Sequence, residues 1–179
     1  MRKLNMDELN RVSVEKFNEL VKLPVICVLD NIRSQHNIGS IFRTSDAFRI
    51  EELYLCGITA TPPNREINKS ALGATESVKW QYFSDTSLAV YQLKESGYKV
   101  IAIEQAFGSS NLEDYSPAAS EKIALVFGNE VTGVSESIME IVDACIEIPQ
   151  FGTKHSFNVS VTAAIVLYHF YTRFKKCLA

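Results

Sequence analysis

No apolar stretch of this 179-residue chain approaches the roughly 18–20 residues that a helix needs to span a bilayer. The first eight residues carry two basic and two acidic side chains and lack the apolar core of a signal peptide. We therefore expect a cytoplasmic protein without membrane association. A composition of 46% hydrophobic and 22% charged residues is typical of one globular domain.

Three common signatures of nucleotide and hydrolase chemistry are also missing. The chain has no Gly-x-Gly-x-x-Gly after its first expected strand, no Gly-x-x-x-x-Gly-Lys-Ser/Thr and no Gly-x-Ser-x-Gly. These absences argue against a dinucleotide-binding Rossmann domain, a P-loop nucleotidase and an α/β-hydrolase.

Metal-ligating patterns are scarce as well. The four cysteines include no Cys-x-x-Cys pair, and the three histidines show no ligand spacing with them. Three cysteines lie in apolar runs, which indicates buried, reduced thiols. We expect no metal site. The residues concerned are Cys27, Cys56, Cys145, Cys177, His36, His155 and His169.

The net charge of −3 argues against a general nucleic-acid coat, because such proteins are usually basic. The distribution is uneven, however. The segment 149–179 has four basic residues and no acid, and 31–49 has three arginines against Asp46 alone. A local basic surface and ordinary solvated faces explain this pattern equally well.

Apolar runs and helical periodicity alternate along the chain. This order predicts an α/β fold with a mainly parallel sheet and helices on both faces. The expected strands are 25–29, 53–56, 78–83, 98–103, 122–127 and 144–148. The expected helices are 7–22, 37–48, 85–96, 135–141 and 158–177, and a long polar connection, 57–77, is a functional candidate. Ligands of such sheets bind beyond the carboxyl ends of the strands. This rule points to the loops 30–39, 128–133 and 149–157.

The first of these loops leads into Asn-Ile-Gly-Ser-Ile-Phe-Arg at 37–43. Asn37 is a competent helix N-cap, and Gly39 permits close backbone approach. Arg43 follows Asn37 by six residues, nearly two helical turns, so we expect both side chains to face one side. Taken alone, a capped helix with one surface arginine explains this segment as well.

The second loop is Gly-Asn-Glu-Val-Thr-Gly at 128–133, directly after an apolar strand. Two glycines that bracket a polar turn can present backbone N–H and C=O groups to a flat heterocycle. Glu130 is harder to explain as structure. Taken alone, the signal is weak, since turns with glycine after a strand are common.

The third loop, 149–157, is polar and precedes a strongly apolar helix. Capping of that helix by Ser156 or Asn158 is the simplest interpretation. It leaves unexplained why so long a polar loop precedes a buried helix.

The three loops in this order resemble the SpoU (TrmH) branch of the SPOUT methyltransferases. The resemblance rests on Asn-x-Gly-x-x-x-Arg, then Phe-Gly-Asn-Glu-x-x-Gly-Val, then Ile-Pro followed by Ser-Phe-Asn-Val-Ser, and covers roughly 24–175. The small-residue stretch 71–78 also looks like the one that follows the mobile loop of that family.

This resemblance implies an RNA ribose 2′-O-methyltransferase that uses S-adenosyl-L-methionine. It implies a methyltransferase domain at 24–179, after an N-terminal helical extension at 1–23, with a deep trefoil knot in its C-terminal part. It also implies a homodimer whose interface includes the first motif and the C-terminal helix. The apolar content of 158–170 is compatible with that role.

The resemblance also implies site residues. Those beside the target ribose are Asn37, Arg43, Glu130, Ser156 and Asn158. Those around the methyl donor are Val126, Phe127, Gly128, Asn129, Glu130, Gly133, Ile148, Pro149, Ser156, Phe157 and Asn158. The basic residues expected to contact RNA, with plain surface charge as the alternative, are Arg33, Arg43, Arg65, Lys69, Lys154 and His155.

The resemblance implies a role for Arg43, because the arginine at this position of the family's motif is often assigned as the base that removes the 2′-hydroxyl proton. A free guanidinium loses its proton only above about pH 12, so a neutral arginine at pH 7 costs roughly 7 kcal/mol. The alternative is an arginine that stays charged, grips a phosphate and stabilises the developing alkoxide. Arg43 is expected to be essential in either role.

Two other functions compete with this interpretation. A catalytically idle RNA-binding dimer would be expected to have lost the ribose-side residues, which are all present. An enzyme acting on ribosomal RNA would often carry an extra N-terminal RNA-binding domain. Only about 23 residues precede the first expected strand, which favours transfer RNA.

Overall fold

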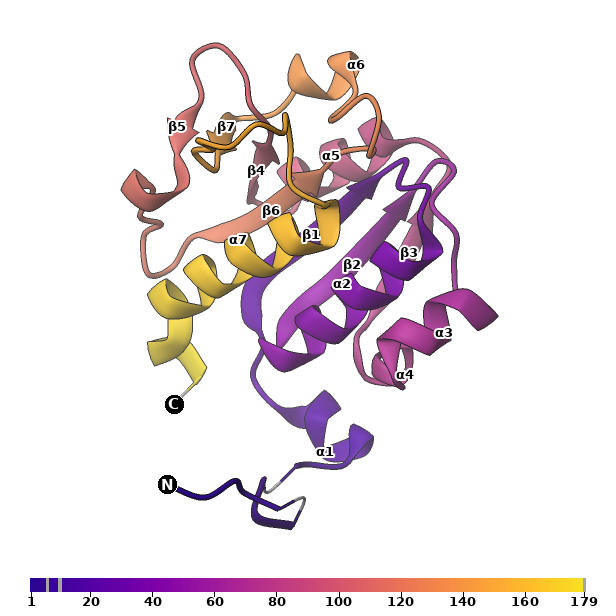
Figure 1. The fold of residues 1–179 in the computed structure, drawn as a ribbon. Helices are drawn as coiled ribbons and strands as arrows, with labels where there is room; N and C mark the ends of the chain where they lie inside the picture. Colours follow the sequence, from indigo (N-terminus) through magenta and orange to yellow (C-terminus); the bar gives the residue numbers. More distant parts are fainter. Residues whose placement is uncertain (6, 10, 179) are drawn as a thin grey trace.

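The computed structural model describes residues 1–5, 7–9 and 11–178 (Figure 1). Its centre is a seven-stranded sheet in the order β3-β2-β1-β6-β4-β7-β5, and every ladder between these strands is parallel. The predicted α/β class with a mainly parallel sheet is therefore confirmed. The strands are β1 (Leu23–Asp30), β2 (Ile50–Cys56), β3 (Trp80–Phe83), β4 (Tyr98–Ile103), β5 (Ser110–Asn111), β6 (Lys122–Phe127) and β7 (Ala144–Glu147).

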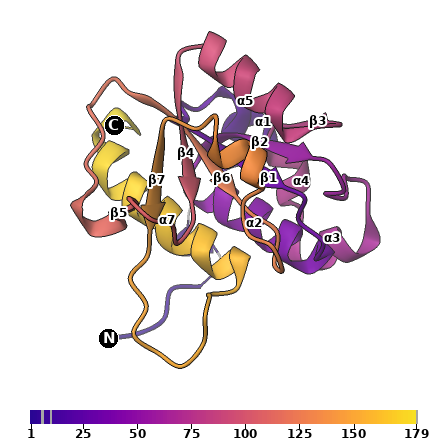
Figure 2. The same cartoon turned by 90° about the horizontal axis from the view of Figure 1, so that it is seen from above.

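Helices cover both faces of the sheet (Figure 2). One face packs against α2 (Gln35–Ala47) and α7 (Val159–Phe174), and the other against α5 (Thr86–Glu95) and α6 (Glu136–Met139). The remaining helices are α1 (Val14–Glu19), α3 (Arg65–Ala71) and α4 (Ala74–Ser77), with 3-10 turns at Asp7–Leu9, Leu112–Asp114 and Lys175–Leu178. In the described part of the chain, no helix has the length and apolarity to cross a membrane.

The apolar strands have the pattern that this sandwich of layers requires. In β1, Cys27 and Leu29 belong to the core beneath α2 and α7, whereas Ile26 and Val28 belong to the core beneath α5. Successive side chains of a strand point to opposite faces, so a continuous apolar run buries both of them.

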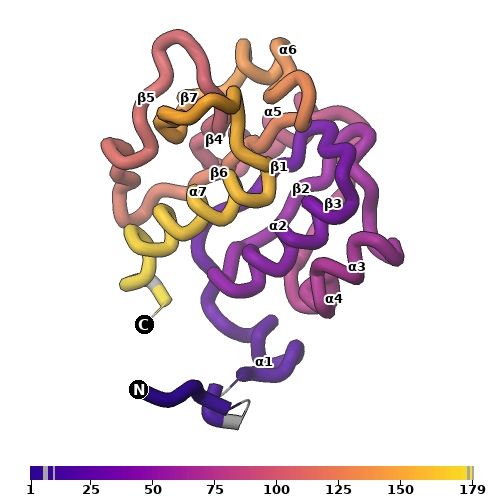
Figure 3. Tube along the Cα trace, in the orientation of Figure 1, coloured from indigo at the N-terminus to yellow at the C-terminus, as the bar shows by residue number. Residues whose placement is uncertain are grey.

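The helix expected over 7–22 is wrong in its extent. The structure has a 3-10 turn and the short α1, which begins after Ser13, whose hydroxyl accepts a hydrogen bond from the backbone N–H of Lys16. Val12 and Val21 are exposed, so little tertiary packing supports a longer helix. Helix α1 lies at the end of the molecule away from α6 (Figure 3).

The polar connection 57–77 contains α3 and α4, which the sequence analysis missed. Asn64 caps α3 by accepting hydrogen bonds from the backbone N–H groups of Glu66 and Ile67, at 2.9 and 3.2 Å. Ile67 is fully buried in the core. An N-cap asparagine three residues before an isoleucine was the available signal, and the neighbouring prolines obscured it.

Loops leave the carboxyl ends of four neighbouring strands, β1, β6, β4 and β7, at one edge of the sheet. Three of them are the loops that the sequence singled out, and the fourth follows β4. In open parallel sheets this edge is where ligands bind.

Candidate functional site

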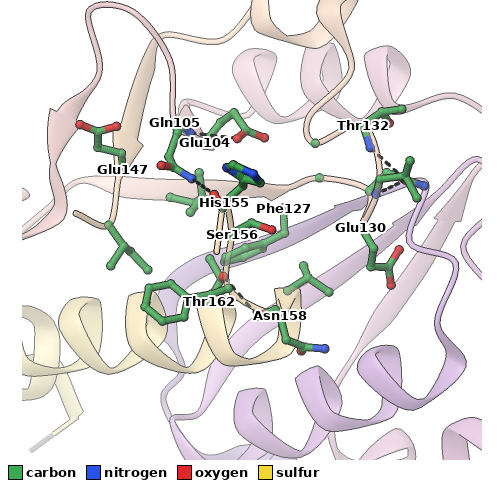
Figure 4. Close-up of a pocket in the computed structure, with 18 of the residues that line it drawn as sticks. Glu104, Gln105, Phe127, Glu130, Thr132, Glu147, His155, Ser156, Asn158 and Thr162 are labelled. Carbon is green, nitrogen blue, oxygen red and sulfur yellow. Dashed lines mark hydrogen bonds between the residues drawn. The ribbon is translucent and has the colours of Figure 1, made fainter. Parts of the chain in front are cut away.

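A cavity of about 520 Å³ lies beyond the carboxyl ends of β4, β6 and β7, beside the start of α7 (Figure 4). This volume is within the ~300–1,000 Å³ of ordinary small-molecule sites. Its lining combines apolar side chains such as Phe127 and Ile148 with the carboxylates of Glu104, Glu130 and Glu147. The cavity therefore offers apolar surface together with negative charge.

Most residues that the sequence assigned to the donor site line this cavity. They are Phe127, Gly128, Asn129, Glu130, Gly133, Ile148, Ser156, Phe157 and Asn158. Val126 and Pro149 are not among the lining residues. Val126 faces the opposite side of the sheet, where it is buried beneath α5, because it alternates with Phe127 along β6.

The loop after β4 is the part of the site that the sequence analysis missed. Glu104 and Gln105 line the cavity, and Gln105 Nε2 donates a hydrogen bond to the carbonyl of His155 at 2.7 Å (Figure 4). The available signal was their position directly after a buried strand. The other lining residues that were not predicted as part of the donor site are Ile103, Val131, Thr132, Glu147, Gln150, His155, Val159 and Thr162.

Backbone groups shape the turn at 128–134. Asn129 and Gly133 exchange two backbone hydrogen bonds of 2.9 Å, which close the turn. A Cβ on Gly128 would lie well inside van der Waals contact with backbone atoms of Gly133 and Val134. Gly133 itself has a φ of +70°, a conformation that favours glycine. Glycine at 128 thus permits a close approach that no other residue allows.

Three side chains, from the first turn of α2, the turn at 128–134 and the N-cap of α7, form a continuous series of hydrogen bonds at one end of the cavity. Asn37 Nδ2 donates to Glu130 Oε1 at 3.0 Å, and Asn158 Nδ2 donates to Asn37 Oδ1 at 3.1 Å. Glu130 also accepts the backbone N–H groups of Arg33 and Ser34, both at 3.1 Å. The structure therefore brings together Asn37, Glu130 and Asn158, as the resemblance implied.

Helix capping decides which of these side chains remain available. Ser34, not Asn37, caps α2, and its hydroxyl accepts a hydrogen bond from the backbone N–H of Asn37. The expectation that Asn37 is the cap is wrong. The side-chain amide of Asn37 is therefore available to donate a hydrogen bond to Glu130. Asn158 does cap α7 as expected, because its Oδ1 accepts from the backbone N–H of Ser160 at 2.9 Å.

The sequence of this chain matches the model of a known protein family. Residues 24–168 match the model of the SpoU rRNA Methylase family. The chain belongs to this family. The three motifs lie within the matched range.

Several relatives of this SpoU-family chain are named for their reactions. It is 33% identical over 159 residues to the 23S rRNA (guanosine-2'-O-)-methyltransferase RlmB of Neisseria meningitidis, covering 88% of this chain and 62% of the relative. It is 35% identical over 148 residues to the tRNA (guanosine(18)-2'-O)-methyltransferase of Aquifex aeolicus, covering 80% and 67%. The chain thus spans about three fifths of the first relative.

Solved structures show the same fold. The A. aeolicus TrmH/SpoU tRNA modifying enzyme superposes with a TM-score of 0.80 at 26% identity, covering 92% of this chain and 83% of that chain. The AviRb methyltransferase of Streptomyces viridochromogenes superposes with a TM-score of 0.76 at 20% identity, covering 91% and 64%. The second likeness concerns the fold alone.

Arg43 lies apart from the series of hydrogen bonds at the end of the cavity. It is exposed on α2 and is not among the residues that line the cavity. Six helical residues turn about 240° beyond one full turn, so Arg43 points about 120° away from Asn37. The expectation that both face one side of the helix is therefore wrong. Arg43 remains on the solvent-facing surface of the SpoU-family domain.

The other basic residues expected to contact RNA lie on separate loops. Arg33, Arg65 and Lys154 are exposed. Lys69 forms an ion pair with Glu66 at 2.7 Å, so part of its charge is compensated within α3. His155 lines the cavity.

Glu130 is a carboxylate at neutral pH. Partial burial acts to raise the pKa of Glu130, but the hydrogen bonds donated to it, from Arg33, Asn37 and Ser34 among others, together lower this pKa below its ordinary value. A depressed folded-state pKa stabilises the fold above the unfolded-state pKa, and this contribution is lost as pH falls through the folded-state value. The hydrogen bonds to Glu130 are therefore intact at neutral pH and weaken only in acid.

Replacing Glu130 by glutamine is expected to lower methyl transfer at neutral pH about tenfold. Its Oε1 accepts from the backbone of Ser34 and its Oε2 from that of Arg33, so an amide group would place an NH₂ against one of these donors. Initial rates with saturating RNA measure the effect. Glu136→Gln, on the exposed first residue of α6, is the matched control. Unchanged rates in Glu130→Gln would contradict a role for these bonds.

Proposed function

We propose that this chain transfers a methyl group from S-adenosyl-L-methionine to a ribose 2′-hydroxyl of RNA. The observation that carries the proposal is a cavity lined by the tight turn at 128–134. At one end of this cavity, hydrogen bonds link Asn37 to Glu130 and to Asn158. Membership of the SpoU rRNA Methylase family supports the reaction. The relatives named as 2′-O-methyltransferases support ribose as the acceptor.

The residues of the cavity fit this methyl donor. The apolar lining at Phe127 and Ile148 suits an adenine ring, and Gly128 lets the backbone at Gly133 and Val134 approach closely, which shapes the turn beside it. Carboxylates of Glu104 and Glu147 favour a ligand that carries positive charge. When bound, S-adenosyl-L-methionine supplies an electrophilic methyl group on a sulfonium sulfur.

The residues of this protein contribute to methyl transfer mainly by positioning the reactants and by their charge. Asn37 is held by Glu130 and Asn158, so its amide has one fixed orientation. The ribose is proposed to approach this end of the cavity, with Ser156 beside it. Arg43 either removes the 2′-hydroxyl proton or stabilises the developing alkoxide as a cation.

We further propose a homodimer that uses α7. Val161, Ile165 and Tyr168 are 46%, 37% and 57% exposed. Their spacing of four and three residues places them on one face of the helix. A solvent-exposed apolar stripe of this kind is typical of a protein interface. In such a dimer Arg43 can serve the cavity of the partner subunit.

Ile165→Asp is expected to convert a dimer into a monomer, because it buries an unpaired carboxylate in the proposed interface. Size-exclusion chromatography with light scattering measures the mass. Leu88→Asp, on the exposed face of α5, is the matched control and should leave the mass unchanged. A dimer that persists in Ile165→Asp would exclude this face as the interface.

The methyltransferase domain is proposed to begin at residue 24, after a short extension. Its C-terminal part is proposed to form a trefoil knot. In its support, the chain leaves β7 near one edge of the sheet and returns to place α7 against α2, beside the central strands. The similarity to the A. aeolicus structure is a second support.

Transfer RNA is the proposed substrate, supported by the relative that is 35% identical and named for tRNA guanosine 18. Ribosomal RNA is the second candidate, favoured by the 33% identical relative named for 23S rRNA. Mapping of ribose methylation in total RNA with and without the gene tests both. The loss of one 2′-O-methyl mark in tRNA is the expected result.

A titration with S-adenosyl-L-methionine separates the enzyme from an idle RNA-binding dimer. The enzyme binds the donor in the absence of RNA, whereas the idle dimer does not. Absence of binding would overturn the proposed function.

A further inference from the structure

Asp30 is a fully buried carboxylate at the end of the central strand β1. Its Oδ1 accepts hydrogen bonds from Asn31 Nδ2 at 2.8 Å and Thr86 Oγ1 at 2.6 Å. Its Oδ2 accepts from the backbone N–H of Ser135 at 2.8 Å and from Ser135 Oγ at 2.7 Å. All four donors are uncharged. A buried negative charge with neutral partners is costly and needs every one of these bonds.

The bonding pattern requires a carboxylate at this position. Hydroxyl groups can rotate to donate or accept, but a backbone N–H and an amide NH₂ only donate. One such obligate donor faces each oxygen: Asn31 Nδ2 at Oδ1 and the N–H of Ser135 at Oδ2. An asparagine at position 30 would therefore oppose one obligate donor with its own NH₂. Asp30 cannot be exchanged for its amide without breaking one of the two connections.

These two connections lead to opposite ends of the turn at 128–134, which lines the cavity. Ser135 follows the turn directly. At its start, Asn129 Nδ2 donates to the carbonyl of Asn31 at 2.6 Å, and the side chain of Asn31 is held by Asp30. Asn31 has a φ of +56°, in the left-handed region that asparagine adopts more readily than most residues. Asp30 thus supports both ends of the turn.

We infer that Asp30 is a positioning residue for the methyl donor. It does not line the donor cavity. Through Ser135 and through Asn31 it holds the 128–134 turn in the shape that binds the donor. This inference rests on the proposed function, since it names the support of that same site.

Asp30→Asn is the variant that tests the inference, with binding of S-adenosyl-L-methionine measured by calorimetry and rates measured with varied donor and varied RNA. The dissociation constant and the KM for the donor are expected to rise about tenfold. The kcat at saturating donor and the KM for RNA are expected to stay within about threefold. Asp85→Asn is the matched control, because Asp85 caps α5 and asparagine caps equally well. It should leave all values unchanged.

Hydrogen exchange of the backbone amides provides a readout that does not depend on catalysis. In Asp30→Asn the amides of Val134 and Ser135 should exchange faster than in the wild type, while those of α5 keep their protection. Ser135→Ala removes only the hydroxyl bond and should weaken donor binding about threefold, so it serves if Asp30→Asn does not fold.

The outcomes separate this inference from the proposed function. Failure of the wild-type protein to bind the donor overturns the proposed function, and exchange at Val134 and Ser135 still tests the support of the turn. Unchanged exchange in the variants overturns the inference. An unchanged donor affinity also overturns the inference if the variants show faster amide exchange or a lower melting temperature. Asp30 would then stabilise the fold without affecting donor binding.

Discussion

Replacing Arg43 by alanine is expected to reduce methyl transfer by about 10²–10³-fold, while binding of S-adenosyl-L-methionine stays unchanged. A loss of this size is usual when a general base or a group that stabilises a developing oxyanion is removed. Arg43 does not line the cavity in which the donor is proposed to bind, so donor affinity should not respond. Single-turnover rates and calorimetric titration measure the two quantities.

Arg11→Ala is the control for this variant, since Arg11 is exposed in the N-terminal segment away from the cavity. Arg43→Lys distinguishes the two possible roles. A lysine keeps the positive charge but loses the planar fork of donors, so partial activity would favour charge stabilisation. An Arg43→Ala protein that methylates RNA at the normal rate would contradict any catalytic role for this residue.

In the proposed dimer, Arg43 and the cavity that it serves belong to different subunits. If Arg43 serves the cavity of the partner subunit, mixing Arg43→Ala protein with Gly128→Ala protein should restore activity to about one quarter of the wild type. Half of randomly mixed dimers are mixed, and each contains one intact site in a two-fold arrangement. No restoration would place Arg43 and the cavity that it serves in the same chain.

Gly128→Ala is expected to weaken binding of S-adenosyl-L-methionine about 100-fold or more. The added Cβ would overlap backbone atoms of Gly133 and Val134, and backbone cannot move aside as a flexible side chain can. The turn must then open, which removes the shape of the cavity and strains its closing hydrogen bonds. Equilibrium titration with the donor alone measures this effect without any RNA.

Gly152→Ala is the matched control for that substitution. Gly152 lies in the loop between β7 and α7, and a Cβ there meets nothing within 4 Å. Donor affinity should therefore remain at the wild-type level. Normal affinity in Gly128→Ala would show that the close approach in the turn is not needed for donor binding.

The site could be predicted from the sequence to the extent that it consists of strand ends. Because carboxyl ends of neighbouring parallel strands meet at one edge, three loops distant in sequence could be expected to converge. The bond between Asn37 and Asn158, 121 residues apart, confirms this for the first and third loops. The loop after β4 was missed, because its Glu104 belongs to no pattern that the other loops share.

Other features were hidden because they depend on partners that no local pattern reveals. Asp30 looks like an ordinary acid at the end of a strand, yet two of the residues that donate hydrogen bonds to it, Thr86 and Ser135, lie 56 and 105 residues away. The direction of Arg43 follows from the 3.6-residue helical period, since α2 contains both Asn37 and Arg43 and six residues separate their side chains by about 120°. Residue types and spacing thus indicated the site, whereas tertiary hydrogen bonds determine how its parts are held.

The most direct test of the central proposal is the chemical identity of the methylated product. The purified protein is incubated with labelled S-adenosyl-L-methionine and unmodified RNA, and the RNA is then digested to nucleosides. The proposal predicts that, after complete digestion, the label lies in a single 2′-O-methylnucleoside. After alkaline cleavage alone, the label should lie in a dinucleotide, because a 2′-O-methyl group protects the adjoining phosphodiester bond. Label in a base-methylated nucleoside, or no label in RNA although the donor is bound, would contradict it.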